Sequence, residues 1–276
     1  MIPRPALTRT VVDGVAFWTD EHLRETTGLL VAFTERRGGV SAPPYDSLNV
    51  AAHVGDESAA VDENRRILLD ALGIGQLRDR LVTAEQVHGE AIADVEQADA
   101  GRGAFAAHAP LPLASTDALL TAAPDVPLML LFADCVPVVL VAPGPRPLVA
   151  VVHAGWRGAL SRLPGKVARR MAEGAGVGAN ALLAYVGPHI GECCYDVNGE
   201  RMSQFAEQFA TISPARARLD LAAVVSESLA DEGIPESRQC HLGVCTMDHT
   251  DAFYSYRAEK RTGRHAAVAA VLKTHR

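Results

Sequence analysis

The fold is decided by the stretch LMLLFADCVPVVLVAPGPRPLVAVVHAGWRG, residues 128–158. It holds three apolar runs of strand length, Leu128 to Phe132, Val136 to Val141 and Leu148 to Val152. Continuous apolar runs are typical of strands that are buried on both faces. Ala133-Asp134-Cys135 follows the first run, and His153-Ala154-Gly155-Trp156-Arg157-Gly158 follows the third. We therefore expect one thiol and one imidazole at the edges of core strands.

The same kind of pattern recurs along the chain. Leu81-Val82-Thr83 leads into Gln86-Val87-His88-Gly89 as another apolar run that ends on a histidine. Further strands are predicted at Leu29–Phe33, Thr116–Thr121 and Leu182–Val186, and Ala266–Leu272 is predicted as a strand or a helix. Helical periodicity is found over Asp56–Leu72, Gly158–Gly174, Gly199–Phe209 and Asp220–Glu232. Mixed strands and helices indicate an α/β class or a mixed α+β sandwich.

The chain has 276 residues, which is within reach of one large domain, so we expect a single domain over 1–276. Residues 1–27 are predicted to form an N-terminal arm or an edge hairpin. Residues 99–115 are rich in Ala, Gly and Pro, and are predicted to form a flexible surface loop.

Composition narrows the class of protein. The net charge of −7 argues against a nucleic-acid surface, and no apolar run reaches the ~20 residues that cross a bilayer. There is no pattern of a secretory signal. Five cysteines are an odd number, and two are adjacent, so we expect a reducing, cytoplasmic setting. Cys193, Cys194, Cys240 and Cys245 are expected neither to bind zinc nor to form an obligatory disulfide.

His88, Cys135 and His153 are candidate ligands of one metal ion. Two imidazoles and one thiolate would leave an open fourth position, as in a catalytic zinc site, where a bound water can be activated. Asp134 could orient a ligand or act as a general base. Two other interpretations stay open from the residues alone: a Cys135 nucleophile paired with one histidine, and ordinary core residues.

Four polar residues are candidates for substrate binding. Arg36 and Asn49 lie in a long loop with little pattern, and Arg65 lies on the predicted helix 56–72, where a solvated face is the alternative. Arg157 stands at a predicted helix start, where a charge-assisted contact with an anion such as phosphate is favoured.

Several blocks resemble the signature of the YfiH-type family, long labelled laccase-domain or polyphenol oxidase proteins. These are Gln86-Val87-His88-Gly89, Ala133-Asp134-Cys135-Val136-Pro137, His153-Ala154-Gly155-Trp156-Arg157-Gly158, Arg36-Arg37-Gly38-Gly39-Val40-Ser41, Leu48-Asn49, Glu63-Asn64-Arg65, Thr116-Asp117-Ala118, Gly187-Pro188, Ser255-Tyr256-Arg257 and Thr262-Gly263-Arg264. Glu35 departs from the family pattern, which usually has a small residue there.

The resemblance implies a single-domain α/β sandwich with mixed sheets flanked by helices, and zinc on His88, Cys135 and His153. It also implies phosphate-dependent cleavage of purine nucleosides (adenosine, inosine, guanosine and methylthioadenosine) together with adenosine deamination. Two alternatives are an editing hydrolase of peptidoglycan precursors and a copper-dependent, laccase-like polyphenol oxidase. Cu²⁺ can occupy such a site in vitro, but the ten histidines include no His-X-His pair of the multicopper kind.

Overall fold

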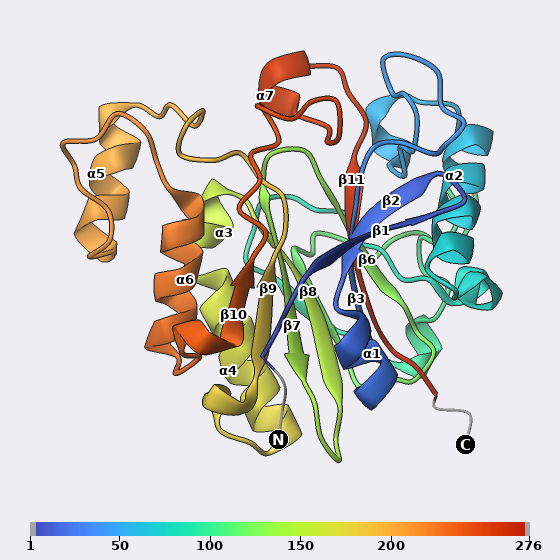
Figure 1. The fold of residues 1–276 in the computed structure, drawn as a ribbon, viewed down its shortest axis with the longest axis horizontal. Coiled ribbons are helices and arrows are strands. Elements are labelled where there is room, and N and C mark those ends of the chain that lie inside the picture. The colour runs from blue at the N-terminus through green and yellow to red at the C-terminus, as the bar shows by residue number, and fades with distance from the viewer. Residues whose placement is uncertain (1–3, 274–276) are drawn as a thin grey trace.

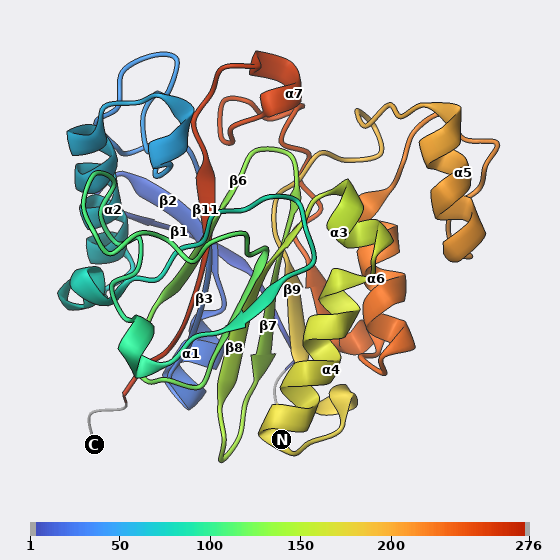
Figure 2. The same ribbon diagram turned by 180° about the vertical axis from the view of Figure 1, so that it is seen from behind.

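The computed structural model describes residues 4–273 of the chain. Two β-sheets pack against each other, and helices cover their outer faces (Figures 1 and 2). The chain is therefore a four-layered α/β sandwich, and the predicted fold class is confirmed.

The first sheet has five strands in the order β1-β2-β3-β11-β6, and all its neighbouring strands are antiparallel. Its strands are β1 (Thr8–Val12), β2 (Val15–Thr19), β3 (Leu29–Thr34), β6 (Leu128–Phe132) and β11 (His265–Val271). β1 and β2 form a hairpin at one edge. The last strand, β11, lies between β3 and β6 and so ties the two ends of the chain into one sheet.

The second sheet has six strands in the order β10-β9-β7-β8-β5-β4, with parallel pairs only at its two edges. Its strands are β4 (Ile92–Asp94), β5 (Ala118–Thr121), β7 (Val136–Ala142), β8 (Leu148–Ala154), β9 (Leu183–Val186) and β10 (Gln239–His241). β6 and β7 are consecutive but belong to different sheets, so the Ala133-Asp134-Cys135 turn bridges the sandwich.

The helices are α1 (Glu21–Thr27), α2 (Ser58–Ala71), α3 (Trp156–Leu160), α4 (Leu163–Ala175), α5 (Gly199–Gln208), α6 (Leu221–Asp231) and α7 (Tyr256–Glu259). α2 packs on the outer face of the first sheet, while α4 and α6 pack on the outer face of the second. α7 lies at one end of the sandwich (Figure 1).

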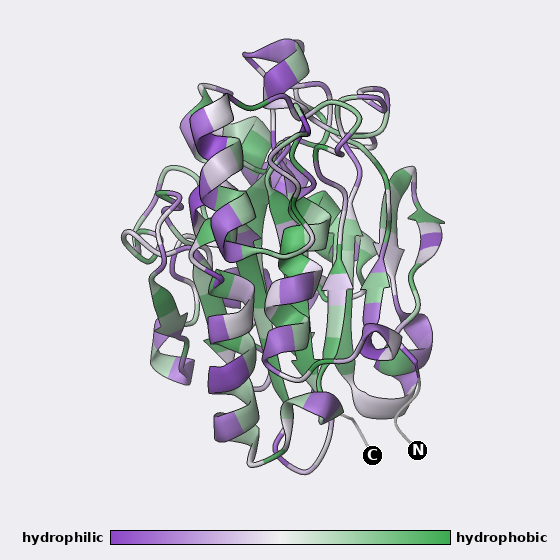
Figure 3. Cartoon of the chain, turned by 90° about the vertical axis from the view of Figure 1, so that its left-hand side faces the viewer, coloured by the Kyte–Doolittle hydropathy of each residue, from purple (hydrophilic) through white to green (hydrophobic). Residues whose placement is uncertain are grey.

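The apolar runs are continuous because each sheet is covered on both faces. In β3, Val31 and Phe33 point between the sheets, whereas Leu30 and Ala32 point toward α2. In β7, Val139 and Val141 are likewise turned inward, and the intervening residues face α4 and α6. Figure 3 shows the result, with hydrophobic strands inside and hydrophilic residues on the helices in front of them.

Three predicted elements differ in detail. The helix expected over Gly158–Gly174 is two helices, α3 and α4, because Arg162 adopts a left-handed backbone with φ 60° that breaks the ladder. The Leu81–Thr83 run does not form a full strand, and within it Val82 makes an isolated β-bridge to Leu128. In the loop 99–115, Gly103 and Ala104 are buried, whereas 107–111 is exposed.

Acid is expected to destabilise the fold through His265, which is fully buried in β11. Burial, with the charge of Arg264, lowers the pKa of His265 from 6.5 to about 3. Between pH 6.5 and about pH 3, His265 is protonated in the unfolded chain and neutral in the folded chain. The free energy of unfolding therefore decreases as the pH falls through this range. The slope from this group is at most ~1.4 kcal/mol per pH unit. Urea titrations at several pH values should show a smaller slope for His265→Leu, and equal slopes would contradict the prediction.

Candidate metal centre and adjoining cavity

The structure brings His88, Cys135 and His153 together from three separate segments. Their ligand atoms all lie within 4.8 Å of one another. Cys135 Sγ is 3.6 Å from His88 Nε2, and the two imidazole rings meet edge to face with centroids 4.7 Å apart. His153 is in β8, Cys135 is in the β6–β7 turn, and His88 is in the loop before β4.

Unusual backbone conformations orient the side chains of the three candidate ligands. Asp134 and His88 have left-handed backbones, with φ 88° and 58°. Gly155 lies against the group, because a Cβ there would approach His88 Cδ2 to 2.8 Å and Cys135 Sγ to 3.3 Å. Only glycine at position 155 leaves space for the imidazole and the thiol to converge.

Asp117 organises the group, although no role was predicted for it from the sequence. Its buried carboxylate accepts hydrogen bonds from the backbone N–H groups of Val87, His88 and Gly89, at 3.2, 3.0 and 2.7 Å. His153 Nδ1 donates to Asp117 Oδ1 at 2.7 Å. An ionised carboxylate only accepts, so Nδ1 carries the ring proton and Nε2 keeps its lone pair for a ligand.

The electrostatics favour a thiolate. Removal from water opposes ionisation of Cys135, but the nearby His153 and His88 outweigh it and lower the pKa of Cys135 to about 6. Burial disfavours the charged form of His153, yet Cys135 and Asp117 together raise its pKa to about 9. Without a metal the thiolate and an imidazolium therefore stabilise each other.

The donor set fits a metal ion. Two imidazoles and one thiolate match the three protein ligands of a catalytic zinc, and the same set also binds copper. Within residues 4–273, no fourth His, Cys, Asp or Glu ligand joins this group. His189 Nδ1 instead lies 2.9 Å from the carbonyl oxygen of Gly187. The open position expected from the sequence is thus available to water or a substrate.

A cavity of about 310 Å³ opens onto these residues at the end of the sandwich that carries α7 (Figure 1). A pocket of this size takes a small organic molecule. The lining comprises His53, Gln86, His88, Leu131, Ala133, Asp134, Cys135, His153, Ile190, Tyr195, Tyr256, Arg257 and Arg264. The cavity thus combines the candidate metal ligands with two tyrosines and two arginines.

Asp134 lines the cavity, but both of its oxygens are already engaged. Thr246 Oγ1 donates to Oδ1 at 2.7 Å, and the backbone N–H of Arg257 donates to Oδ2 at 2.6 Å. These bonds hold the start of α7 and the loop around Thr246 against the β6–β7 turn. Its position therefore suits an orienting role better than that of a general base.

Three of the four predicted substrate-binding residues do not line the cavity. Arg36 is buried and donates to the carbonyls of Asp46 and Thr250 and to Glu259. Asn49 is fully buried and bonds to Ala51, Asp56 and the backbone of Arg264. Arg65 donates to the carbonyls of Val50, Gly103 and Ala104. Their donors are used within the protein to fix the loops around the cavity, and their substrate-binding roles stay a prediction.

Arg157 stays close to the group. It lines a smaller hollow of about 230 Å³ that shares His88, Asp134 and Cys135 with the main cavity. Its guanidinium lies over the ring of Trp156, 4.5 Å from the centroid. A cation is thus available on a second side of the candidate metal site.

The sequence reasoning missed Arg257 and Arg264 as cavity residues, although both belong to the blocks that resemble the family. Arg257 lies at the start of α7, and Arg264 just before β11. Burial lowers the pKa of Arg264 below its ordinary value, although the guanidinium stays charged near neutrality. Their place in two family blocks was the available signal, but spacing alone did not show where the side chains point.

None of the helices within residues 4–273 has both the length and the hydrophobicity that a bilayer crossing requires.

Known proteins of similar sequence cover most of the chain. Residues 30–272 match the profile of a family described as "Multi-copper polyphenol oxidoreductase laccase". A protein named purine nucleoside phosphorylase YlmD, from Bacillus subtilis, is 33% identical over 244 residues, 86% of this chain and 86% of that protein. Another, purine nucleoside phosphorylase YfiH from Escherichia coli, is 32% identical over 247 residues, 87% of this chain and 93% of that protein.

A solved structure shares the fold. YlmD from Geobacillus stearothermophilus superposes with a TM-score of 0.86 at 30% identity, covering 98% of this chain and 100% of that one. The match extends over both sheets and over the segments that carry the candidate ligands. The chain therefore belongs to the YfiH-type family, whose family description is that of a laccase.

Proposed function

We propose that this protein is a zinc-dependent purine nucleoside phosphorylase that also deaminates adenosine. Adenosine, inosine, guanosine and methylthioadenosine are its proposed nucleosides, and inorganic phosphate is the second substrate. The names of its relatives support phosphorylase activity. We further propose a reducing, cytoplasmic setting, because a thiolate ligand needs a reduced cysteine.

One observation carries the proposal: cationic side chains and the candidate metal ligands face the same cavity. Arg257 and Arg264 line it together with His88, Cys135 and His153. Arginines bind phosphate through charge-assisted hydrogen bonds. The tyrosines Tyr195 and Tyr256 offer aromatic faces for a purine base. A nucleoside and a phosphate can thus be bound side by side.

In phosphorolysis, a phosphate oxygen forms a bond to C1′ of the ribose while the bond from C1′ to the purine nitrogen breaks. The leaving purine gains a proton, and the products are ribose 1-phosphate and the free base. Arg257 and Arg264 would hold the phosphate, with Arg157 as a further cation on the side of the smaller hollow. Holding both reactants in line accelerates such a displacement through proximity.

In deamination, water adds to C6 of adenosine and ammonia leaves. His88, Cys135 and His153 would hold a zinc ion, which would supply Lewis acidity to activate the attacking water. Asp117 fixes the tautomer of His153 for this purpose, and Asp134 fixes the cavity wall. Phosphate has no part in this reaction.

The two alternative activities fit less well. A multicopper oxidase needs a cluster of several histidines, and the groups of possible ligands within residues 4–273 contain only His88 and His153. A cavity of about 310 Å³ suits a nucleoside better than a cell-wall precursor, which joins a nucleotide, a sugar and a peptide.

The direct test is inosine turnover with and without phosphate. We expect hypoxanthine and ribose 1-phosphate only when phosphate is present, and adenosine deamination in both buffers. Hypoxanthine released at one rate in both buffers would make the protein a nucleoside hydrolase, and the proposed role of the arginines would then be wrong.

Arg264→Gln is expected to raise the KM for phosphate about tenfold or more, since a charge-assisted hydrogen bond contributes ~1.5–3 kcal/mol. Arg157→Ala should act in the same direction, and both variants should change adenosine deamination less. Arg216→Gln is the matched control, because Arg216 pairs with Glu192 on the surface, away from the cavity lining. Steady-state kinetics with varied phosphate measure the effect, and an unchanged KM in Arg264→Gln would contradict it.

A further inference from the structure

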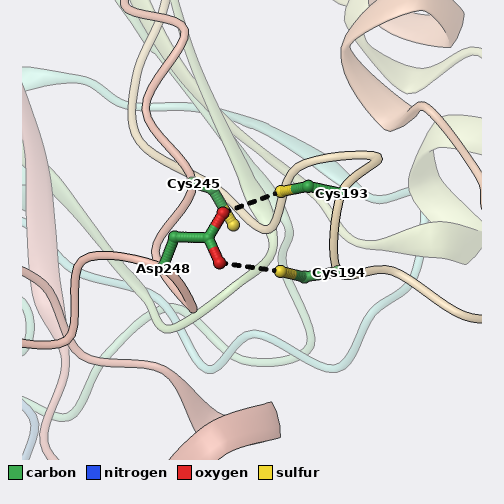
Figure 4. Close-up of side chains that lie close together, drawn as sticks. All are labelled: Cys193, Cys194, Cys245 and Asp248. Carbon is green, nitrogen blue, oxygen red and sulfur yellow. Dashed lines mark hydrogen bonds between the residues drawn. The ribbon is translucent and has the colours of Figure 1, made fainter.

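We propose that Cys193, Cys194, Cys245 and Asp248 form a second metal site, separate from the first, for a thiophilic cation such as Zn²⁺. Their ligand atoms all lie within 4.8 Å of one another. Figure 4 shows the arrangement, in which the Asp248 carboxylate faces the thiols. The four residues share no ligand with the group of His88, Cys135 and His153.

Two turns bring the four residues together. Cys193 and Cys194 lie in the turn after β9, where the N–H of Cys194 donates to the carbonyl of Gly191 at 3.0 Å. Cys245 and Asp248 are three residues apart in a turn before α7, the spacing of a Cys-X-X-Cys zinc motif with a carboxylate in place of one thiol. Each turn thus offers two ligands, which is the usual construction of a structural zinc site.

Gly191 supports the convergence. Its N–H donates to Cys245 Sγ at 3.3 Å, the kind of bond that orients and stabilises a metal-bound thiolate. A Cβ at position 191 would approach Cys193 Sγ to 3.1 Å and the Cβ of Cys245 to 3.3 Å. The two turns can approach each other this closely because residue 191 has no side chain.

The ligand atoms are close enough to share one ion. Cys193 Sγ and Cys194 Sγ lie 3.0 and 3.1 Å from the two oxygens of Asp248. Zinc–sulfur bonds of ~2.3 Å in a tetrahedron place sulfurs roughly 3.8 Å apart, which is about 1 Å less than the 4.8 Å within which all the ligand atoms lie. Three sulfurs select a soft or borderline cation over Mg²⁺ or Ca²⁺.

The hydrogen bonds to Asp248 show the state that metal binding would replace. They raise the pKa of both thiols, that of Cys194 to about 11, so the thiols are protonated near neutrality. Zn²⁺ binding then forms three Zn–S bonds and one Zn–O bond, and each thiol that becomes a thiolate ligand releases its proton to the buffer.

The position of the site indicates what it does. Cys193 and Cys194 lie between Ile190 and Tyr195, which both line the main cavity. Thr246, beside Cys245, donates to Asp134, which also lines the cavity. A metal on the two turns would clamp them together and hold the cavity wall. This structural role is independent of the proposed reaction.

The test uses the full chain with His88→Ala and His153→Ala, which removes the first site. We expect this background, reduced and freed of metal, to bind one Zn²⁺ per chain with release of protons, and Co²⁺ to give a thiolate charge-transfer band. Adding Cys193→Ser and Asp248→Asn together removes two of the four ligands and should abolish the band and the bound equivalent. Both residues are exposed, so these variants should fold, and the melting temperature checks it.

Cys240→Ser is the matched control, because Cys240 lies in β10 outside both groups and should leave the band intact. No bound zinc in the background would overturn the proposal, as would equal binding after Cys193→Ser and Asp248→Asn. Loss of two titratable thiols without reductant, restored by reductant, would assign the cluster to a disulfide instead. None of these outcomes depends on phosphorylase activity.

Discussion

Replacing Cys135 with alanine is expected to remove the metal from His88 and His153 and to reduce turnover of inosine and adenosine below detection. The thiolate is the only anionic ligand of the three, and its sulfur lies 3.6 Å from His88 Nε2. Two neutral imidazoles alone bind zinc weakly, because a catalytic site needs three protein ligands. Elemental analysis of Cys135→Ala in the Cys193→Ser, Asp248→Asn background, which lacks the proposed second site, measures the bound metal, and the two assays measure turnover.

Cys240→Ala is the control for Cys135→Ala, since Cys240 is half-buried in β10 and lies outside both candidate metal groups. It should leave the kinetics within about twofold. Full zinc occupancy in an inactive Cys135→Ala protein would instead support a cysteine nucleophile, the alternative that the residues alone left open.

Asp117→Asn is expected to weaken metal binding by ~10–100-fold, the usual effect of losing the partner that orients a ligand. The carboxylate now accepts bonds from His153 Nδ1 and from the backbone of Val87, His88 and Gly89. An amide has the same shape, but its NH₂ group would face one of these donors and repel it. Both the tautomer of His153 and the loop of His88 would then be less well held.

Competition for zinc with a chromophoric chelator measures the affinity of Asp117→Asn, again in the Cys193→Ser, Asp248→Asn background. Asp251→Asn is the control, because Asp251 is an exposed carboxylate that pairs with Arg37 on the surface. Equal affinities of Asp117→Asn and the parent would show that Asp117 supports the fold only.

The strands, and the proximity of His88, Cys135 and His153, could be predicted from the sequence because both signals are local. The strands β3, β6, β7 and β8 are apolar runs that are buried on both faces. Such runs can be recognised as strands without knowing which strands they pair with. His88, Cys135 and His153 follow or end such runs, so their meeting at one end of the sandwich could be expected.

The arginines were harder to assign, because sequence does not show where a long side chain points. Arg36 and Arg65 lie in family blocks as Arg264 does, yet their guanidinium groups bond to backbone carbonyls. Arg264 donates to the carbonyls of Thr262 and Gly263 and still lines the cavity. The packing of α2 and of the loop before β11 decides which arginine lines the cavity, and this packing cannot be seen in the sequence.

Two further features depend on contacts between distant segments. Asp117 holds the loop that carries His88, and it accepts a hydrogen bond from Gly89, which lies 28 residues earlier in the chain. The thiols of Cys193 and Cys194 meet Cys245 only because the turn after β9 folds against the turn before α7. Our prediction that these cysteines bind no zinc rested on the adjacent pair and on a reducing setting, and the geometry now supports the opposite proposal.

Zinc X-ray absorption of the Cys193→Ser, Asp248→Asn protein tests the central claim most directly, because this variant lacks the proposed second site. We predict one sulfur at ~2.3 Å and two imidazole nitrogens at ~2.0–2.1 Å, with one further light atom in the fourth position. A first shell without sulfur, or one with two or more sulfurs, would contradict a metal centre on His88, Cys135 and His153.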